Sequence, residues 1–310
     1  MSAGETAAIE ARDLTKHFKD VKAVQGLNMK VQKGEIFGFL GPNGAGKTTT
    51  IKMIMGLVRP TQGEVLVKGD QVGTNTVEIR QNIGFLPERI SFYENLTPVQ
   101  TLNFFCELKG EDKSCIDALI EEVGLKEAAN RKMGTFSKGM VQLVGVAQAM
   151  IGDPSIYILD EPMGGLDARW VKVVREKIKL LKDKGATIIF SSHILSEVEN
   201  ICDRVAIIDK GELVAEDTIT NISKLLDIRP QLVIMIPGLD GEVPGVVKTI
   251  DGIERVGVGG DELVITCDSS LRARVISVLE EDGLKIEDIR TIEPSLEDAF
   301  VRLVSERGGG

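Results

Sequence analysis

Apolar and polar positions in this chain follow two periods, one typical of strands and one of helices. Residues 21–31 alternate between apolar and polar side chains, as in a half-buried strand, and residues 9–18 form an extended segment before them. Nearly uninterrupted apolar runs, typical of buried strands, occupy residues 35–40, 83–86, 155–161 and 186–191. A two-residue hairpin turn is predicted at Lys210-Gly211. These patterns predict an α/β fold with a mixed sheet.

Helical periodicity predominates in the middle of the chain. Residues 96–108, 114–123 and 126–131 contain almost no β-branched runs, and a helical pattern continues to residue 151. Because these stretches lie between predicted strands, we expect a helical subdomain over about residues 92–150. Other helices are expected over about residues 168–184 and after residue 46, where one face holds Ile51, Ile54, Met55 and Leu57.

A second, smaller domain is predicted beyond Arg229-Pro230, which divides the chain into residues 1–228 and 229–306. Its elements follow the order β-α-β-β-α-β, which resembles a split βαβ module with an α+β fold. A last helix is expected from Ser295, with the apolar residues Leu296, Phe300, Leu303 and Val304 on one face. Residues 307–310 are expected to form a disordered tail.

Composition limits the protein class. The 310 residues are 43% hydrophobic and 27% charged, as in globular proteins, and no apolar run reaches the roughly 18 residues of a membrane-spanning helix. The N-terminus does not resemble a secretory signal, so we expect a cytoplasmic protein. A net charge of −10 argues against nucleic acid as a partner. The four cysteines are far apart in sequence, which predicts reduced thiols without a metal.

The candidate chemistry begins at residues 41–49, which have the form G-x-x-x-x-G-K-[ST] between a predicted strand and a predicted helix. Glycines allow consecutive backbone N–H groups to face a polyphosphate, and the helix N-terminus adds partial positive charge. Lys47 would reach the terminal phosphates, and the Thr48 hydroxyl would bind Mg²⁺. The alternative is a glycine-rich turn that binds nothing. The predicted nucleotide-binding residues here are Gly41, Asn43, Gly44, Ala45, Gly46, Lys47, Thr48 and Thr49.

A second candidate cluster lies at the ends of two predicted strands. Residues 155–161 end in Asp160 and Glu161, and ligands bind at the carboxyl ends of strands in open α/β sheets. Asp160 is placed to help hold Mg²⁺, and Glu161 to face the water that attacks the γ-phosphate. His193 follows the next strand and could hydrogen-bond a phosphate. The alternatives are a solvated strand end and a structural histidine.

Two other residues have both a structural and a functional interpretation. Ser137 occupies a predicted N-cap position, which could either cap the helix or direct its hydroxyl and free N–H groups at an anion. Phe18 precedes the phosphate loop and could either pack in the core or stack on a purine.

The order of these motifs resembles that of the ATP-binding-cassette (ABC) ATPases over about residues 9–226. The shared features are the phosphate loop, a helical insertion ending in the serine-glycine signature, a strand ending in Asp-Glu, a turn bearing Asp167, and His193. The resemblance implies a head-to-tail homodimer that holds ATP between the phosphate loop of one copy and the signature helix of the other. It also implies an integral membrane permease as partner.

The resemblance assigns roles to individual residues. It implies that Ser137 and Gly139 bind the γ-phosphate of the ATP on the other copy, and that Asp167 crosses the dimer interface. It further implies that Glu161 is the catalytic base, His193 the sensor of the γ-phosphate, Lys47 the phosphate-binding lysine, Phe18 the residue that stacks on adenine, and Glu88 a contact to Mg²⁺.

Several positions depart from the family pattern. Glu88 replaces a glutamine and adds negative charge near Mg²⁺, and Leu143 stands where arginine is common. Met163 stands where threonine or serine is usual. The signature is Phe-Ser-Lys-Gly-Met over residues 136–140, so Lys138 and Met140 are expected to alter contacts to the opposing ATP.

Other segments suggest a subgroup. Pro87-Glu88, the variant signature and residues 294–300 look like the ATPases of ABC-2 type exporters, and residues 85–93 most resemble the NosF type, which serves copper-site maturation of nitrous oxide reductase. The implied location is the cytoplasmic face of the cell membrane, bound to the permease through a groove around residues 92–108. A periplasmic or extracellular subunit is an optional further partner.

Three alternatives stay open. The chain could serve another ABC-2 exporter, of drugs, lipids, ions or polysaccharides. It could also be a soluble ABC ATPase acting on DNA or the ribosome, although it has one cassette, no zinc spacing and an acidic composition. A P-loop kinase would leave the signature helix unexplained.

Overall fold

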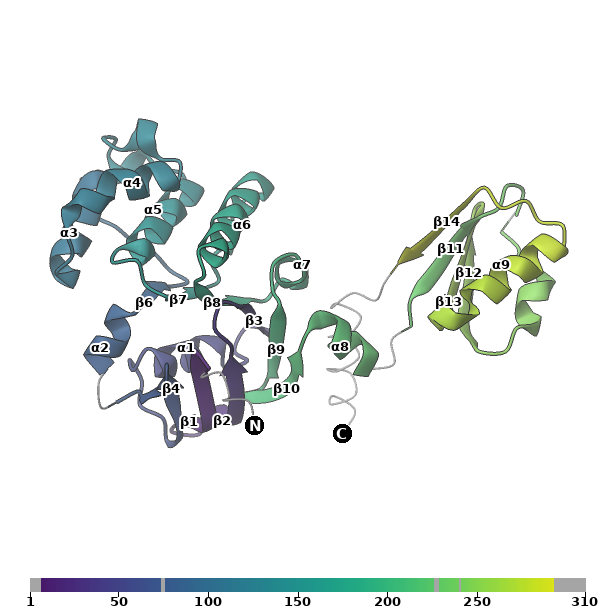
Figure 1. Cartoon of the computed structure of the whole chain (residues 1–310), viewed down its shortest axis with the longest axis horizontal. Coiled ribbons are helices and arrows are strands. Elements are labelled where there is room, and N and C mark those ends of the chain that lie inside the picture. The colour runs from purple at the N-terminus through teal and green to yellow at the C-terminus, as the bar shows by residue number, and fades with distance from the viewer. Residues whose placement is uncertain (1–6, 74–75, 226–228, 240, 293–310) are drawn as a thin grey trace. The chain divides into compact units, whose positions relative to one another are not determined.

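The computed structural model describes residues 7–73, 76–225, 229–239 and 241–292 (Figure 1). The chain divides into two compact units between Ile219 and Thr220, whereas the sequence analysis places the domain boundary at Arg229. The helix predicted from Ser295 and the tail predicted over residues 307–310 lie outside the described residues.

The first unit contains two sheets. The central sheet has the order β10-β9-β3-β8-β7-β6, with parallel neighbours except for the antiparallel hairpin of β9 and β10. The smaller sheet is antiparallel, in the order β2-β1-β4-β5. This confirms the predicted mixed α/β architecture. The strands are β1 (Ile9–Phe18), β2 (Val21–Val31), β3 (Ile36–Leu40), β4 (Gln62–Val67), β5 (Asp70–Gln71), β6 (Ile83–Leu86), β7 (Ile156–Asp160), β8 (Thr187–Ser192), β9 (Arg204–Asp209) and β10 (Glu212–Asp217).

Local sequence signals explain where the longer helices begin. Thr97 and Gln100 form a reciprocal capping box at the start of α3. Ser137, as predicted, caps α5 by accepting a hydrogen bond from the N–H of Met140, and Asp167 caps α6 in the same way. The helices are α1 (Lys47–Ile54), α2 (Thr76–Gln81), α3 (Pro98–Lys109), α4 (Ile116–Glu122), α5 (Lys138–Met150), α6 (Ala168–Asp183), α7 (Leu195–Glu199) and α8 (Ile219–Leu225).

Some predicted helices differ from the structure. The helix after the phosphate loop ends at Ile54, and Gly56 at a φ of 64° turns the chain, so Leu57 lies 53% exposed and not on the apolar face. Residues 126–131 form only a 3-10 turn over Lys126–Ala128. The helices α2 and α7 were not predicted.

The second unit is an antiparallel sheet in the order β12-β13-β11-β14 (Figure 1). This is the predicted split βαβ arrangement, except that the first connection is the 3-10 turn Gly245–Thr249 and not an α-helix. Leu232, Ile234, Val275 and Leu279 belong to its own core. The elements are β11 (Gln231–Met235), β12 (Ile253–Gly259), β13 (Glu262–Cys267), α9 (Arg272–Glu281) and β14 (Asp288–Ile292).

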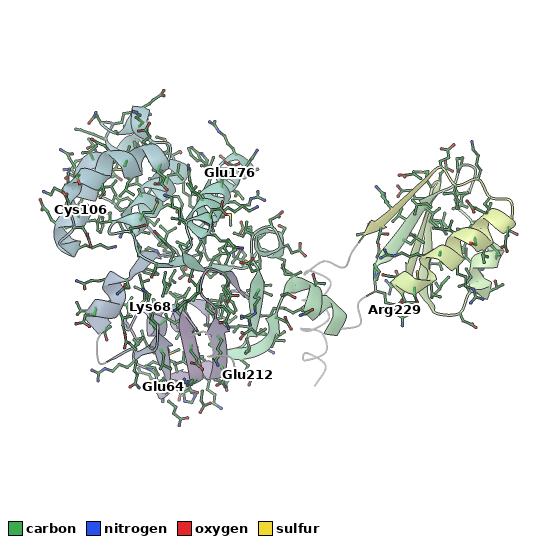
Figure 2. The ribbon with its side chains drawn as sticks, viewed as in Figure 1. Glu64, Lys68, Cys106, Glu176, Glu212 and Arg229 are labelled. Atoms are coloured by element: carbon green, nitrogen blue, oxygen red, sulfur yellow. The ribbon has the colours of Figure 1, made fainter. Side chains whose placement is uncertain are left out.

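Side chains fill the space between the elements of each unit (Figure 2). In the first unit the strands β3, β7 and β8 are buried along their whole length. Because these strands run parallel, their carboxyl ends lie at one edge of the central sheet. The residues that follow these three strands are therefore brought together.

Arg204 forms ion pairs with two carboxylates near the amino ends of the parallel strands, at the edge of the sheet opposite to these residues. Its guanidinium lies 3.2 Å from Glu35 and 2.6 Å from Glu216, and burial raises the pKa of both carboxyls. We expect Arg204→Met to lower the free energy of unfolding by about 3 kcal/mol, because it leaves two largely buried carboxylates without their cation.

Urea unfolding tests this expectation. The control is Arg12→Met, since Arg12 also pairs with two glutamates but is exposed, and its removal should shift the unfolding midpoint little. Equal midpoints for the two variants would contradict the importance of the Arg204 cluster.

Candidate nucleotide site

Residues 41–46 form a loop between β3 and α1 that leaves no room for a larger residue at its two ends, Gly41 and Gly46. A Cβ on Gly41 would lie 2.3 Å from the Ile208 carbonyl oxygen. Gly46 has a φ of 108°, and a Cβ there would lie 2.5 Å from the Ala23 oxygen. Close packing against β2 and β9 thus requires glycine at both positions and fixes the loop at the sheet edge.

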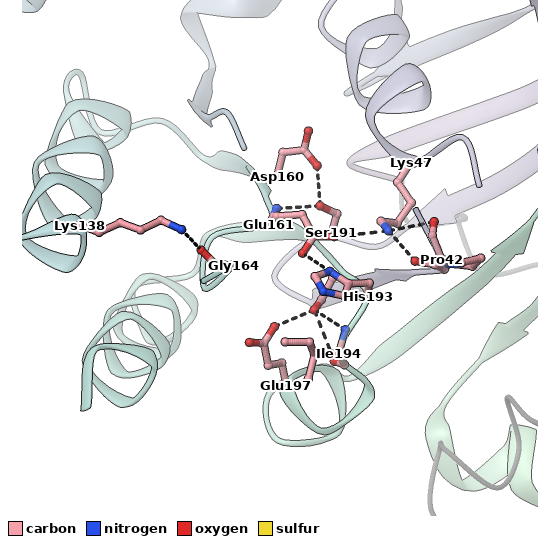
Figure 3. A network of polar contacts seen from close by, with 12 residues as sticks. Pro42, Lys47, Lys138, Asp160, Glu161, Gly164, Ser191, His193, Ile194 and Glu197 are labelled. Atoms are coloured by element: carbon pink, nitrogen blue, oxygen red, sulfur yellow. Dashed lines mark hydrogen bonds and ion pairs between the residues drawn. The ribbon is translucent and has the colours of Figure 1, made fainter. Parts of the chain in front are cut away.

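Lys47 begins α1 and is buried, with 6% of its side chain exposed. Its Nζ donates hydrogen bonds to the carbonyl oxygens of Gly41, at 2.5 Å, and Pro42, at 3.4 Å. The same ammonium lies 3.3 Å from Oε1 of Glu161 (Figure 3). The structure therefore brings the loop lysine and the strand-end glutamate into one ion pair.

Ser191 of β8 holds the two acidic residues at the end of β7. Ser191 Oγ donates to Asp160 Oδ1 at 2.6 Å and accepts from the N–H of Glu161 at 2.8 Å (Figure 3). His193 Nδ1 lies 2.8 Å from Glu161 Oε2. Asp160 is 2% exposed, so its carboxylate depends on such partners. The sequence analysis missed Ser191, because its position beside Asp160 follows from the pairing of β7 with β8.

A further carboxylate lies next to this cluster. Glu197 on α7 is buried and accepts a hydrogen bond of 2.6 Å from Ser192 Oγ. Its burial raises the pKa of the carboxyl, since the charged form loses contact with water.

A cavity of about 930 Å³ opens over the phosphate loop. Its volume is within the range of roughly 300–1,000 Å³ found for ligand pockets. Of the predicted site residues, the lining includes Asn43, Gly44, Ala45, Gly46, Lys47, Thr48, Thr49, Glu88, Glu161 and His193. It also includes the cations Lys22, Arg89 and Lys210, which sequence reasoning did not select as site residues and which suit a polyanionic ligand. Lys138, which the sequence analysis expected to affect contacts to the opposing ATP, lines the cavity too.

Other predicted residues lie outside this lining as far as the described residues show. Phe18 is 46% exposed at the end of β1, and Lys16 Nζ lies 4.8 Å from its ring centroid. Ser137, Gly139 and Asp167 are in the first turns, or caps, of α5 and α6 and do not line the cavity. Gly41 and Asp160 likewise lie behind its wall.

Magnesium fits the donor atoms at this site. Thr48 and Glu88 line the cavity, Asp160 is buried outside its lining, and their hydroxyl and carboxylate oxygens are ligands that Mg²⁺ prefers. In the described part of the chain, no group of three or more His, Cys, Asp or Glu side chains could hold a metal alone.

Within residues 7–73, 76–225, 229–239 and 241–292, no helix is both long and apolar enough to cross a bilayer.

Comparison with known proteins identifies relatives along the whole chain. The profile of the ABC transporter family matches residues 24–164. The bacitracin transport ATP-binding protein BcrA of Bacillus licheniformis is 38% identical over 97% of this chain and 98% of its own length. The linearmycin resistance ATP-binding protein LnrL of Bacillus subtilis is 33% identical over 95% and 97%. A solved ATP-binding subunit of an ABC transporter has 31% identity and a TM-score of 0.65, covering 71% of this chain and 93% of that one.

Proposed function

This chain belongs to the ABC transporter family as an ATPase whose activity is coupled to transport, and we propose that it powers an ABC-2 type exporter. The observation that supports the exporter role is the extent of the match to BcrA, which covers 97% of this chain and so includes the second unit.

The proposed chemistry is hydrolysis of the γ-phosphate of ATP. Lys47 and the N–H groups of residues 41–49 bind the phosphates and stabilise the charge that develops on the transferred group. Glu161 orients or deprotonates the attacking water. His193 Nδ1 lies 2.8 Å from the Glu161 carboxylate, so His193 holds that carboxylate in place and also senses the γ-phosphate. Thr48, Glu88 and Asp160 would hold Mg²⁺, which would supply positive charge against the phosphates of the nucleotide.

The proposed active form is a homodimer. Ser137 is exposed and, like Gly139, lies outside the cavity lining of its own chain, which supports a contact of this helix start with ATP on a second copy. Asp167 would cross the interface, and Phe18 would stack on adenine. The two copies share each nucleotide, so they come together when ATP binds and separate when the γ-phosphate is lost.

The proposed partner is an integral membrane permease, which would hold the chain at the cytoplasmic face of the membrane. The helical insertion around residues 92–108 is the proposed docking site, and Phe104 and Leu108 on α3 are 45% and 67% exposed. Nucleic acid is not among the proposed partners, because the chain carries a net charge of −10. A periplasmic or extracellular subunit is an optional addition.

Two cargo classes are candidates. The relatives transport bacitracin or confer resistance to linearmycin, which supports an antibiotic or similar amphiphile as cargo. The resemblance of residues 85–93 to the NosF type supports a different cargo, one needed to mature the copper site of nitrous oxide reductase.

The exporter role is tested in a bacitracin-sensitive host that expresses the chain together with a candidate permease, chosen from any multi-span membrane protein encoded next to its gene. We expect the two to co-purify in detergent and the host to tolerate severalfold more bacitracin. The control is the same pair with Glu161→Gln. Unchanged tolerance together with loss of copper from nitrous oxide reductase on gene deletion would favour the NosF-type role. Absence of co-purification would contradict both.

A further inference from the structure

The turn after β7 has an unfavourable backbone conformation. Glu161 has a φ of 49°, in the left-handed region that residues other than glycine rarely adopt. The N–H of Gly164 closes the turn by donating to the Glu161 carbonyl oxygen at 3.0 Å. Such a conformation persists only where neighbouring groups hold it. The groups that hold residues 161–164 therefore determine where the Glu161 carboxylate points.

Two side chains of the neighbouring helix α5 donate hydrogen bonds to this turn. Lys138 Nζ donates to the Gly164 carbonyl oxygen at 2.7 Å, and Gln142 Nε2 donates to the Pro162 carbonyl oxygen at 2.7 Å. Residues four apart lie on one face of a helix, so α5 presents both donors to the same segment. Both residues line the cavity together with Glu161, and Figure 3 shows Lys138 reaching the turn.

The first turn of α5 is also packed tightly against the segment that follows. A Cβ on Gly165 would lie 2.4 Å from Lys138 Nζ, and a Cβ on Gly139 would lie 2.3 Å from the ring of Trp170. Glycine at these two positions allows the close approach. Because hydrogen bonds and the Gly139–Trp170 contact join the start of α5 to this segment, a displacement of α5 would also displace the turn.

We propose that Lys138 and Gln142 are positioning residues that hold the turn 161–164 and thereby orient Glu161. This inference rests on the proposed role of Glu161 as the base. It differs from the expectation that Lys138 contacts the opposing ATP, because the ammonium is bonded to Gly164 of its own chain. Since α5 belongs to the helical insertion, the two side chains connect that insertion to the reacting water.

Steady-state kinetics of Lys138→Met test the proposal. We expect kcat to fall about tenfold, because a charge-assisted hydrogen bond to the turn is lost. KM for Mg-ATP should stay within about twofold, since Lys138 does not bind nucleotide. Lys138→Arg should retain most of kcat because its guanidinium can donate to the same oxygen. The control is Lys132→Met, an exposed lysine of the same insertion, with kinetics like the parent.

Two further measurements separate positioning from general damage. Trp170 is the single tryptophan of the chain, so its emission should shift in Lys138→Met and not in Lys138→Arg. Lys138→Met should also cause no additional loss in a Glu161→Gln background, because the two residues act on one step. If Lys138→Met does not fold, Gln142→Met is measured in the same way and should show the same loss of kcat.

Unchanged kcat in Lys138→Met, or a raised KM with the parent kcat, would overturn the proposal. The activity of Glu161→Gln separately tests whether Glu161 is the base. If that variant is inactive while Lys138→Met behaves like the parent, only the positioning role fails. If Glu161→Gln hydrolyses ATP normally, the assignment of the base fails.

Discussion

Glu161→Gln should reduce ATP turnover by about a thousandfold while nucleotide binding is retained. The amide keeps the size of the side chain but cannot accept a proton from water, and loss of a general base typically costs about 10²- to 10⁴-fold. The phosphate loop and Lys47 are untouched, so the affinity for Mg-ATP should change little. Release of phosphate measures turnover, and isothermal titration with Mg-ATP measures binding.

The control for this variant is Glu176→Gln, a substitution of the same kind on α6, where Glu176 is exposed (Figure 2). It should hydrolyse ATP like the parent. Parental turnover by Glu161→Gln would exclude Glu161 as the base.

Lys47→Met should weaken ATP binding by about 10- to 100-fold. The ammonium is the most buried cation in the cavity lining of the described residues, and hydrogen bonds to charged groups contribute about 1.5–3 kcal/mol each. The substitution also leaves Glu161, whose side chain is 11% exposed, without its cation partner. Titration with Mg-ATP measures the dissociation constant.

Lys52→Met provides the matched control, because Lys52 lies on the same helix but is exposed. It should bind ATP with parental affinity. If both variants bind equally well, Lys47 does not contact the phosphates as we propose.

The phosphate loop could be located from sequence because its determinants are contiguous. Glycines, lysine and threonine occur at fixed spacing between an apolar run and a helical pattern, and the structure places Lys47 at the start of α1 as expected. The pairing of Lys47 with Glu161 was not predicted, although both residues come after buried parallel strands whose carboxyl ends share one edge of the sheet.

Other parts of the cavity could not be predicted because they depend on sheet order. Lys210 reaches the lining since the β9–β10 turn packs on the loop, where the Gly211 N–H donates to the Ala45 oxygen at 2.9 Å. Lys22 and Arg89 come from distant segments for the same reason. Short helices such as α2, six residues long, contain too few turns for a clear period.

The central claim is that two copies of the chain share each nucleotide. Light scattering after size exclusion of Glu161→Gln tests it most directly, because ATP that is not hydrolysed should hold the two copies together. We expect the molar mass of one chain without nucleotide and about twice that mass with Mg-ATP. Adding Ser137→Arg should prevent the increase. A single-chain mass for Glu161→Gln with bound, saturating Mg-ATP would contradict the account.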